Sequence, residues 1–244
     1  MEQRMFKADG IVLRTRILGE ADRLVTLLTL EEGKFEAVAR GARKIKSKLA
    51  AGVDLFNYGH FTFHRGKTWP IITGQDTIKS FSCFREDPDL YPYGIYMAEL
   101  SDRLISGEQP CAEICRLLLE GWKLLGEKNT DRFLLCRSFE LKLAHISGYS
   151  PHLHSCTNCG SEKALAFSPR QGGLMCSCCQ AADAIKMDPG TAAVARRLIK
   201  APLSQSSLVR LSDSQKKELA CVTAAFLTYH LDLGEIKSRR LLAE

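Results

Sequence analysis

The chain has 244 residues, 45% of them hydrophobic, so it can bury a sizeable core, and its length predicts more than one folding unit. Its first residues are polar and charged and no apolar window is long enough to cross a bilayer, which argues against a signal-bearing or membrane-spanning class. We therefore expect a soluble, cytoplasmic protein whose ten cysteines are thiols or metal ligands and not disulfides.

The net charge of +6 is unevenly distributed along the chain. Basic residues outnumber acidic ones by 14 to 9 in residues 1–80 and by 10 to 6 in residues 186–244, whereas acidic residues lead by 11 to 8 in residues 81–150. Because basic surfaces attract polyanions, this asymmetry indicates a polyanionic partner that is held mainly by the N-terminal part of the chain.

The first eighty residues predict a small β-barrel. Five segments alternate in hydrophobicity or are rich in Val, Leu and Thr, and turns containing glycine separate several of them: 6–17, 23–30, 35–40, 55–64 and 68–73. Five strands in this length are typical of a closed or partly open barrel, of which the oligonucleotide-binding (OB) fold is the commonest design. We expect the OB-fold domain to occupy residues 1–82.

A loop before the predicted fourth strand is strongly basic. Residues 34–48 hold six basic side chains against one acid, Glu36. Flexible cations beside glycine amides suit phosphate groups, so on a barrel the loop favours nucleic-acid binding over a merely solvated surface. Three arginines on the first strands extend this set, and the nine candidate nucleic-acid contacts are Arg14, Arg16, Arg23, Lys34, Arg40, Arg43, Lys44, Lys46 and Lys48. A base-stacking aromatic is expected among Phe56, Tyr58, Phe61, Phe63 and Trp69, although most of these will be core.

Beyond a charged linker at residues 84–88 the apolar pattern changes to a helical period. Residues 83–150 predict three amphipathic helices, the third capped by Asp131. Residues 186–244 predict two more, the first opened by Asp188 and Pro189 and the second by Ser212. The predicted class is α+β and multi-domain: an N-terminal OB-fold β-barrel and a helical C-terminal domain in two parts, with a four-cysteine zinc module inserted at residues 151–185.

Two Cys-x-x-Cys hooks dominate the inserted module. Cys156 and Cys159 form the first hook, and Cys176 and Cys179 form the second after an interval of sixteen residues. Paired hooks at this separation are the usual source of four thiolates for one tetrahedral zinc ion. Four thiolates leave no open coordination position, so we expect one structural Zn²⁺ that folds the chain and does not catalyse.

The alternatives for the hooks are a disulfide pair, a redox pair and unrelated buried thiols. A disulfide would require an oxidising compartment, and a thioredoxin-like redox pair should follow a strand within a βαβ unit, which the sequence does not contain. Cys178 complicates the second hook, but the regular spacing favours Cys176 and Cys179 as the ligands.

No catalytic motif is found in the sequence. It contains no Gly-x-x-x-x-Gly-Lys phosphate loop, no Gly-x-Ser-x-Gly elbow and no His-Glu-x-x-His pair. We therefore predict that the protein is not an enzyme.

Several segments of the chain resemble the bacterial recombination mediator family RecO. They follow the order of that family over most of the chain and include the first cysteine hook, together with Gly10-Ile-Val-Leu-Arg-Thr-Arg16, Gly19-Glu-Ala-Asp-Arg23, Leu28-Thr-Leu-Glu-Glu-Gly-Lys34, Ala39-Arg-Gly-Ala-Arg43, Tyr96-Met-Ala-Glu-Leu100, Phe139-Glu-Leu-Lys-Leu143, Gly148-Tyr-Ser-Pro151 and Gly172-Gly173-Leu-Met-Cys176.

The resemblance implies an OB barrel, a helical domain and an inserted zinc module. It further implies binding of single- and double-stranded DNA, annealing of complementary strands, and action with RecR to load RecA onto DNA coated by single-strand-binding protein. Contact with the acidic, hydrophobic tail of that coating protein and a location at the bacterial nucleoid are also implied. A zinc-ribbon transcription regulator is the alternative hypothesis, and a metal-dependent nuclease is the third.

Overall fold

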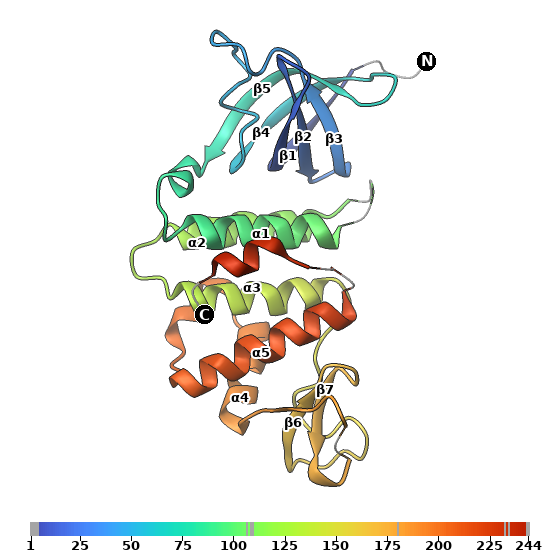
Figure 1. Cartoon of the computed structure of the whole chain (residues 1–244), viewed down its shortest axis with the longest axis vertical. Coiled ribbons are helices and arrows are strands. Elements are labelled where there is room, and N and C mark those ends of the chain that lie inside the picture. Colours follow the sequence, from blue (N-terminus) through green and yellow to red (C-terminus); the bar gives the residue numbers. More distant parts are fainter. Residues whose placement is uncertain are drawn as a thin grey trace. The chain divides into compact units, whose positions relative to one another are not determined.

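The structure, a computed structural model, describes residues 5–105, 107, 110–179, 181–231, 233 and 235–242. Contacts between residues divide the chain into two compact units, 1–119 and 120–244, and helix α2 (Ala112–Leu125) crosses the boundary. Strands dominate the beginning of the chain and helices most of the remainder, which confirms the predicted α+β class (Figure 1). The division into four segments at 82, 150 and 185 stays a prediction. No helix among the described residues is both long and apolar enough to span a membrane.

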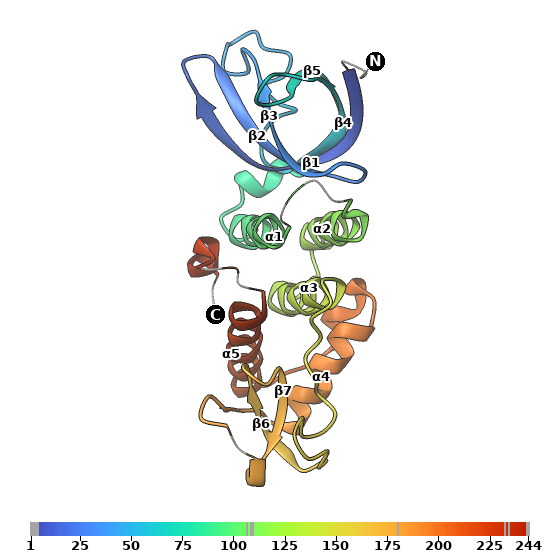
Figure 2. The ribbon, with the colours of Figure 1, turned by 90° about the vertical axis from the view of Figure 1, so that its right-hand side faces the viewer.

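Five strands of the first unit join into a closed barrel in the order β1-β2-β3-β5-β4. Figure 2 looks along this barrel and shows the strands curving round a common interior. All neighbouring strands are antiparallel except β3 and β5, which are parallel and meet at Val38 and Ile71. The strands are β1 (Met5–Leu18), β2 (Asp22–Thr29), β3 (Gly33–Ala39), β4 (Asn57–His64) and β5 (Ile71–Ser80).

The barrel interior is filled by the inward-facing residues of these strands. Val25 and Leu27 of β2 and Phe61 and Phe63 of β4 are fully buried in one hydrophobic cluster. Their spacing of two residues is the period with which a strand presents side chains to one face of a sheet. The alternation in the sequence therefore encodes which face of each strand forms the core.

Helix α1 (Tyr91–Leu104) packs on an aromatic cluster that follows the barrel in the chain. Phe56 has a positive φ of 74° and is fully buried, and its ring lies edge-on to the rings of Phe84 and Tyr91. A Cβ atom at Gly94 of α1 would lie 2.9 Å from the Phe84 ring and 3.2 Å from the Phe56 ring. Only glycine therefore allows this approach of helix and rings.

The second unit is built round α3 (Arg132–Ile146), which is buried on nearly all sides. Helix α3 begins at the Asp131 cap, whose carboxylate accepts from the Leu134 amide at 3.0 Å, as the sequence predicts. The other predicted caps are also confirmed: Asp188 precedes α4 (Pro189–Lys200), and Ser212 forms a capping box before α5 (Asp213–His230). Short 3₁₀ helices complete the helical part of the chain at Ser82–Arg85, Ser177–Cys179, Leu203–Leu208 and Lys237–Leu241.

An ion pair lies inside the second unit, on α3. Arg137 and Glu140 pair at 2.9 Å with side chains 1% and 0% exposed, and Arg137 also donates to the Thr223 hydroxyl of α5 at 3.3 Å. Removing one partner of such a pair leaves a buried charge and typically costs about 3–5 kcal/mol. The pair lies within α3, and the Arg137–Thr223 hydrogen bond connects it to α5.

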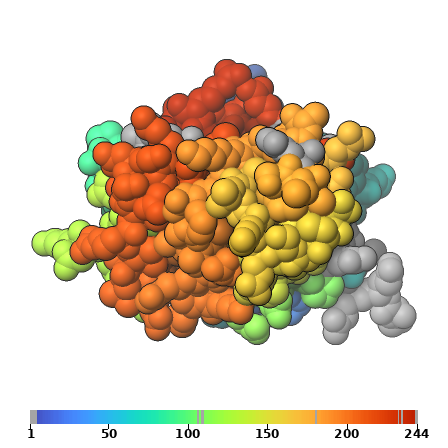
Figure 3. All heavy atoms as spheres, turned by 90° about the horizontal axis from the view of Figure 1, so that it is seen from below, coloured from blue at the N-terminus to red at the C-terminus, as the bar shows by residue number. Residues whose placement is uncertain are grey.

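A small sheet lies between α3 and α4 in the chain and carries the cysteine hooks. Its strands, in spatial order, are β7 (Gly173–Cys176), β6 (Ala164–Ser168) and β8 (Ile185–Lys186). The His230 ring of α5 donates to the Pro169 carbonyl at 2.8 Å, and Arg196 of α4 donates to the Leu153 carbonyl. Figure 3 shows the yellow surface of this module continuous with the orange surface of the helical residues that follow. The module is thus an integral part of the second unit.

Candidate functional site

The two cysteine hooks converge on one point. The sulfur atoms of Cys156, Cys159, Cys176 and Cys179 all lie within 4.8 Å of one another, and the Cys159 and Cys176 sulfurs are 3.6 Å apart. Four thiolate donors at this separation fit one tetrahedral metal ion, with each hook supplying two ligands. Cys178 is exposed and lies outside this group.

Local backbone structure turns each hook towards the metal position. At the first hook, the Gly160 amide donates to the Cys156 carbonyl at 2.9 Å, and Gly160 has a φ of +75° that favours glycine. At the second hook, Cys176 ends β7 and pairs with Ala164 of β6, after which the chain enters a 3₁₀ turn through Cys179. The small sheet therefore sets the distance between the hooks.

The electrostatics of the four thiols favour a bound cation. The backbone amides of Cys159, Cys176 and Asn158 donate to Cys156 and hold its pKa at about 6. For Cys159, the Ser161 amide lowers the pKa, but the three neighbouring thiols outweigh it and raise the pKa to about 12. One thiol therefore ionises readily, and its charge opposes ionisation of the others unless a metal ion neutralises them.

The basic loop places most of its charged side chains in solvent. Arg40, Arg43, Lys44, Lys46 and Lys48 are all exposed. Arg43 donates to the carbonyl groups of the β1–β2 turn, so its side chain also holds the loop against that turn. The other four form no ion pair with any carboxylate that the structure describes. Their charges are therefore available to an anionic partner.

The four candidate residues on the barrel strands are paired with acids. Arg14 and Arg16 lie near Glu36, at 3.8 and 2.8 Å, and their side chains remain about half exposed. Arg23 pairs with Asp54, and Lys34 pairs with Asp102 of α1 at 3.0 Å. The side chains of Arg23 and Lys34 are only 27% and 20% exposed. Arg23 therefore holds the loop before β4 to the barrel, and Lys34 ties the barrel to α1, while both also carry charge.

Burial separates the aromatic candidates. Phe56, Phe61 and Phe63 are fully buried, which removes them from contact with bases. Tyr58 is half-buried, and Trp69 is 36% exposed. Trp69 is therefore the most accessible stacking surface among the five.

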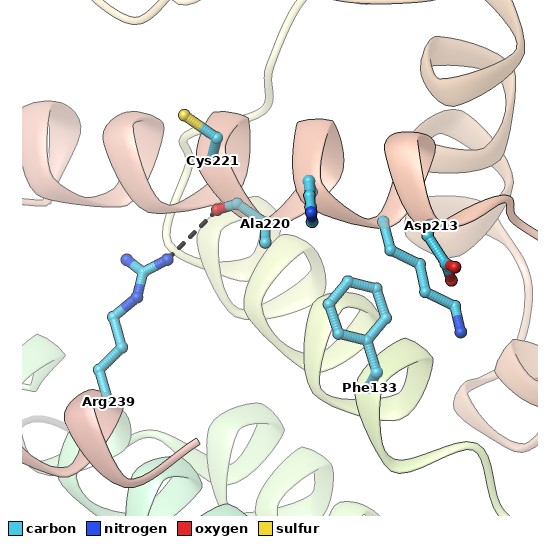
Figure 4. Close-up of a pocket in the computed structure, with 7 residues that line it drawn as sticks. Phe133, Asp213, Ala220, Cys221 and Arg239 are labelled. Carbon is cyan, nitrogen blue, oxygen red and sulfur yellow. Dashed lines mark hydrogen bonds between the residues drawn. The ribbon is translucent and has the colours of Figure 1, made fainter. Parts of the chain in front are cut away.

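The second unit contains a pocket of about 470 Å³ beside α5 that the sequence interpretation does not locate. Figure 4 shows Phe133 of α3 pointing towards α5 and Arg239 donating to the Ala220 carbonyl, at 3.2 Å. The pocket thus combines an apolar floor with three cations and one acid. Its lining residues are Phe133, Asp213, Lys216, Lys217, Ala220, Cys221 and Arg239. The sequence feature that could have pointed to this pocket is the adjacent pair Lys216 and Lys217, near the start of a predicted helix.

Comparisons with known proteins agree over nearly the whole chain. Residues 1–81 match the family model "Recombination protein O N terminal", and residues 85–240 match "Recombination protein O C terminal". A DNA repair protein RecO from Symbiobacterium thermophilum is 34% identical over 98% of this chain and 96% of its own length. Another from Pelotomaculum thermopropionicum is 33% identical over 98% of this chain and 94% of its own length. One from Heliobacterium modesticaldum is 37% identical over 80% of this chain and 74% of its own length.

Proposed function

Because the chain belongs to the RecO family, which supports a role in DNA repair and recombination, we propose that it is a non-enzymatic, DNA-binding recombination mediator. It binds single- and double-stranded DNA, anneals complementary strands and, with RecR, helps to load RecA onto DNA coated by single-strand-binding protein. It acts in the cytoplasm, at the nucleoid. Annealing requires no chemical step, since base pairing supplies the driving force once phosphate repulsion is neutralised.

The observation that carries this proposal is the exposed basic loop on a closed five-stranded barrel. The OB fold, a five-stranded barrel, binds oligonucleotides through one sheet face and loops beside it. Four cations of the loop that are not paired with described acids, Arg40, Lys44, Lys46 and Lys48, supply the phosphate contacts. Arg14, Arg16, Arg23, Lys34 and Arg43 extend this surface while also bonding to other groups of the first unit.

The cysteine cluster is proposed to hold one structural Zn²⁺. Four sulfur donors favour zinc over oxygen-seeking cations such as Mg²⁺ and leave no coordination site for substrate. The ion would fix the second hook against the first and so stabilise the module. Two carbonyl groups of this module accept hydrogen bonds from His230 of α5 and Arg196 of α4.

A salt titration of DNA binding tests the loop. Each phosphate neutralised on single-stranded DNA adds about 0.7 to the slope of log affinity against log salt concentration. Replacing Arg40, Lys44 and Lys46 with alanine should therefore flatten the slope by up to about two units, equally for two unrelated oligonucleotides.

The matched control replaces three exposed lysines of the second unit, Lys123, Lys128 and Lys163, with alanine. This control removes three positive charges, as the loop variant does, and should leave the slope of log affinity against log salt concentration nearly unchanged. An equal response from both triple variants would contradict a site in the loop. Loss of affinity for one sequence only would favour the zinc-ribbon transcription regulator instead.

The pocket beside α5 is proposed to receive the acidic, hydrophobic tail of single-strand-binding protein. Its apolar floor suits a hydrophobic side chain, and Lys216, Lys217 and Arg239 outnumber the one acid, Asp213. Replacing both lysines with alanine should weaken binding of a labelled tail peptide roughly threefold to tenfold, as expected for two exposed ion pairs. Fluorescence polarisation of the peptide measures this binding, and Lys123→Ala/Lys128→Ala is the control that should bind as wild type does. Unchanged binding by the Lys216→Ala/Lys217→Ala variant would place the tail elsewhere.

A further inference from the structure

The basic loop carries an apolar residue at its apex. Ile45 is 104% exposed, more than any other exposed large hydrophobic side chain that the structure describes, and it lies between the exposed cations Lys44 and Lys46. The hydrophobic effect favours burial of such a side chain, and the proposed phosphate contacts leave it unused. Single exposed apolar side chains are common on protein surfaces, so what distinguishes Ile45 is its place between two exposed cations of the basic loop.

The loop is anchored on both sides of this apex. Ala42 and Val53 are buried in the barrel core, and Leu49 packs against it. Between these anchors the chain turns back on itself, because the Lys44 amide donates to the Gly41 carbonyl and the Ser47 amide donates to the Lys44 carbonyl. The loop thus buries Ala42 and Val53, partly buries Leu49 and holds Ile45 out in solvent.

We propose that Ile45 is an apolar wedge that packs against the nucleobases of single-stranded DNA while the adjacent lysines contact its phosphates; this inference rests on the proposed DNA-binding function of the loop. Apolar side chains inserted beside or between bases are a general device of DNA-binding proteins. Bases of a single strand present their faces to solvent, and sequence-independent binders exploit those faces. Lys44 and Lys46 flank Ile45 in the chain, so cations are available for the phosphates on either side of the base that Ile45 contacts.

An anionic membrane surface would also attract a basic loop with an apolar tip. Stable membrane attachment, however, requires a broad apolar face or more than one anchoring signal. The loop offers a single isoleucine at its apex, which is enough for contact with one base step. The structure therefore favours single-stranded DNA.

The experiment titrates an oligonucleotide that carries 2-aminopurine with wild-type protein, Ile45→Ser and Ile45→Phe at several salt concentrations. Ile78→Ser is the matched control, because Ile78 is an isoleucine of the same barrel, 45% exposed, on β5. We expect Ile45→Ser to lower DNA affinity about tenfold at every salt concentration, because the side chain that would be buried in the complex is lost. The slope of log affinity against log salt concentration should not change. The rise in 2-aminopurine fluorescence that accompanies base unstacking should be lost in Ile45→Ser and kept in Ile45→Phe.

The outcomes separate this proposal from the function on which it rests. If Arg40→Ala/Lys44→Ala/Lys46→Ala flattens the slope but Ile45→Ser matches wild type and Ile78→Ser, the loop binds DNA and the wedge is wrong. If the charge variant leaves the slope unchanged, both proposals fail. Binding of wild type, but not Ile45→Ser, to phosphatidylglycerol vesicles with no Ile45 effect on DNA would assign the apex to a membrane. Equal thermal unfolding midpoints confirm that the exposed substitution leaves the fold intact.

Discussion

Cys178 and Cys179 are adjacent in the chain, but only the Cys179 sulfur belongs to the cluster of four. We expect Cys178→Ser to keep about one equivalent of zinc and its unfolding temperature, because the side chain is exposed. Cys179→Ser should lose most of the zinc and unfold at a lower temperature, because metal binding is coupled to folding of the module. Metal analysis of protein purified without added zinc checks both variants, and the opposite pattern would reassign the fourth ligand.

At this scale the sequence predicts some residues well and others poorly. The spacing of the hooks identifies the four clustered cysteines, because ligand geometry repeats between proteins. Asp131, Asp188 and Ser212 are identified as caps because a cap acts on its own helix. The pairing of Arg23 with Asp54 and of Lys34 with Asp102 was not predictable, since those partners meet only through the tertiary fold.

Helix α1 provides a test at the scale of one element, because propensity and packing predict opposite effects at Gly94. In an exposed helix, Gly→Ala stabilises by about 1 kcal/mol. Here the added methyl would approach the Phe84 ring to 2.9 Å, so Gly94→Ala should lower the free energy of unfolding by about 1–3 kcal/mol.

Chemical denaturation measures this change, and Phe84→Leu supplies the control. If the clash with the ring is the cause, Gly94→Ala should cost less in the Phe84→Leu background than in wild type. Stabilisation by Gly94→Ala in the wild-type background would show that the ring moves away freely.

Element prediction succeeded where periodicity extends over many residues. Five barrel strands and five helices were anticipated, but β5 continues to Ser80, beyond the predicted end at residue 73. Bulges between Tyr58 and Gly59 and between Thr62 and Phe63 shift the register of β4 and β5, which obscures the pattern. The strands β6, β7 and β8 have only five, four and two residues, too few for a period to be recognised.

At the scale of the whole molecule, closure of the barrel depends on one parallel contact between β3 and β5, residues more than thirty positions apart. No local pattern encodes that contact, so strand count alone left the choice between closed and open barrels unresolved. The sequence shows the adjacent lysines of the pocket beside α5 but not the pocket itself, because α3, α5 and the last 3₁₀ helix each contribute to it.

The most direct test of the proposed mediator function is the rate of annealing of complementary strands that are already coated with single-strand-binding protein. The wild-type protein should accelerate annealing strongly, and Arg40→Ala/Lys44→Ala/Lys46→Ala should lose most of the acceleration because phosphate repulsion is no longer neutralised. Coating protein that lacks its acidic tail should also reduce the effect. An annealing rate that is the same with and without the wild-type protein would contradict the proposed function.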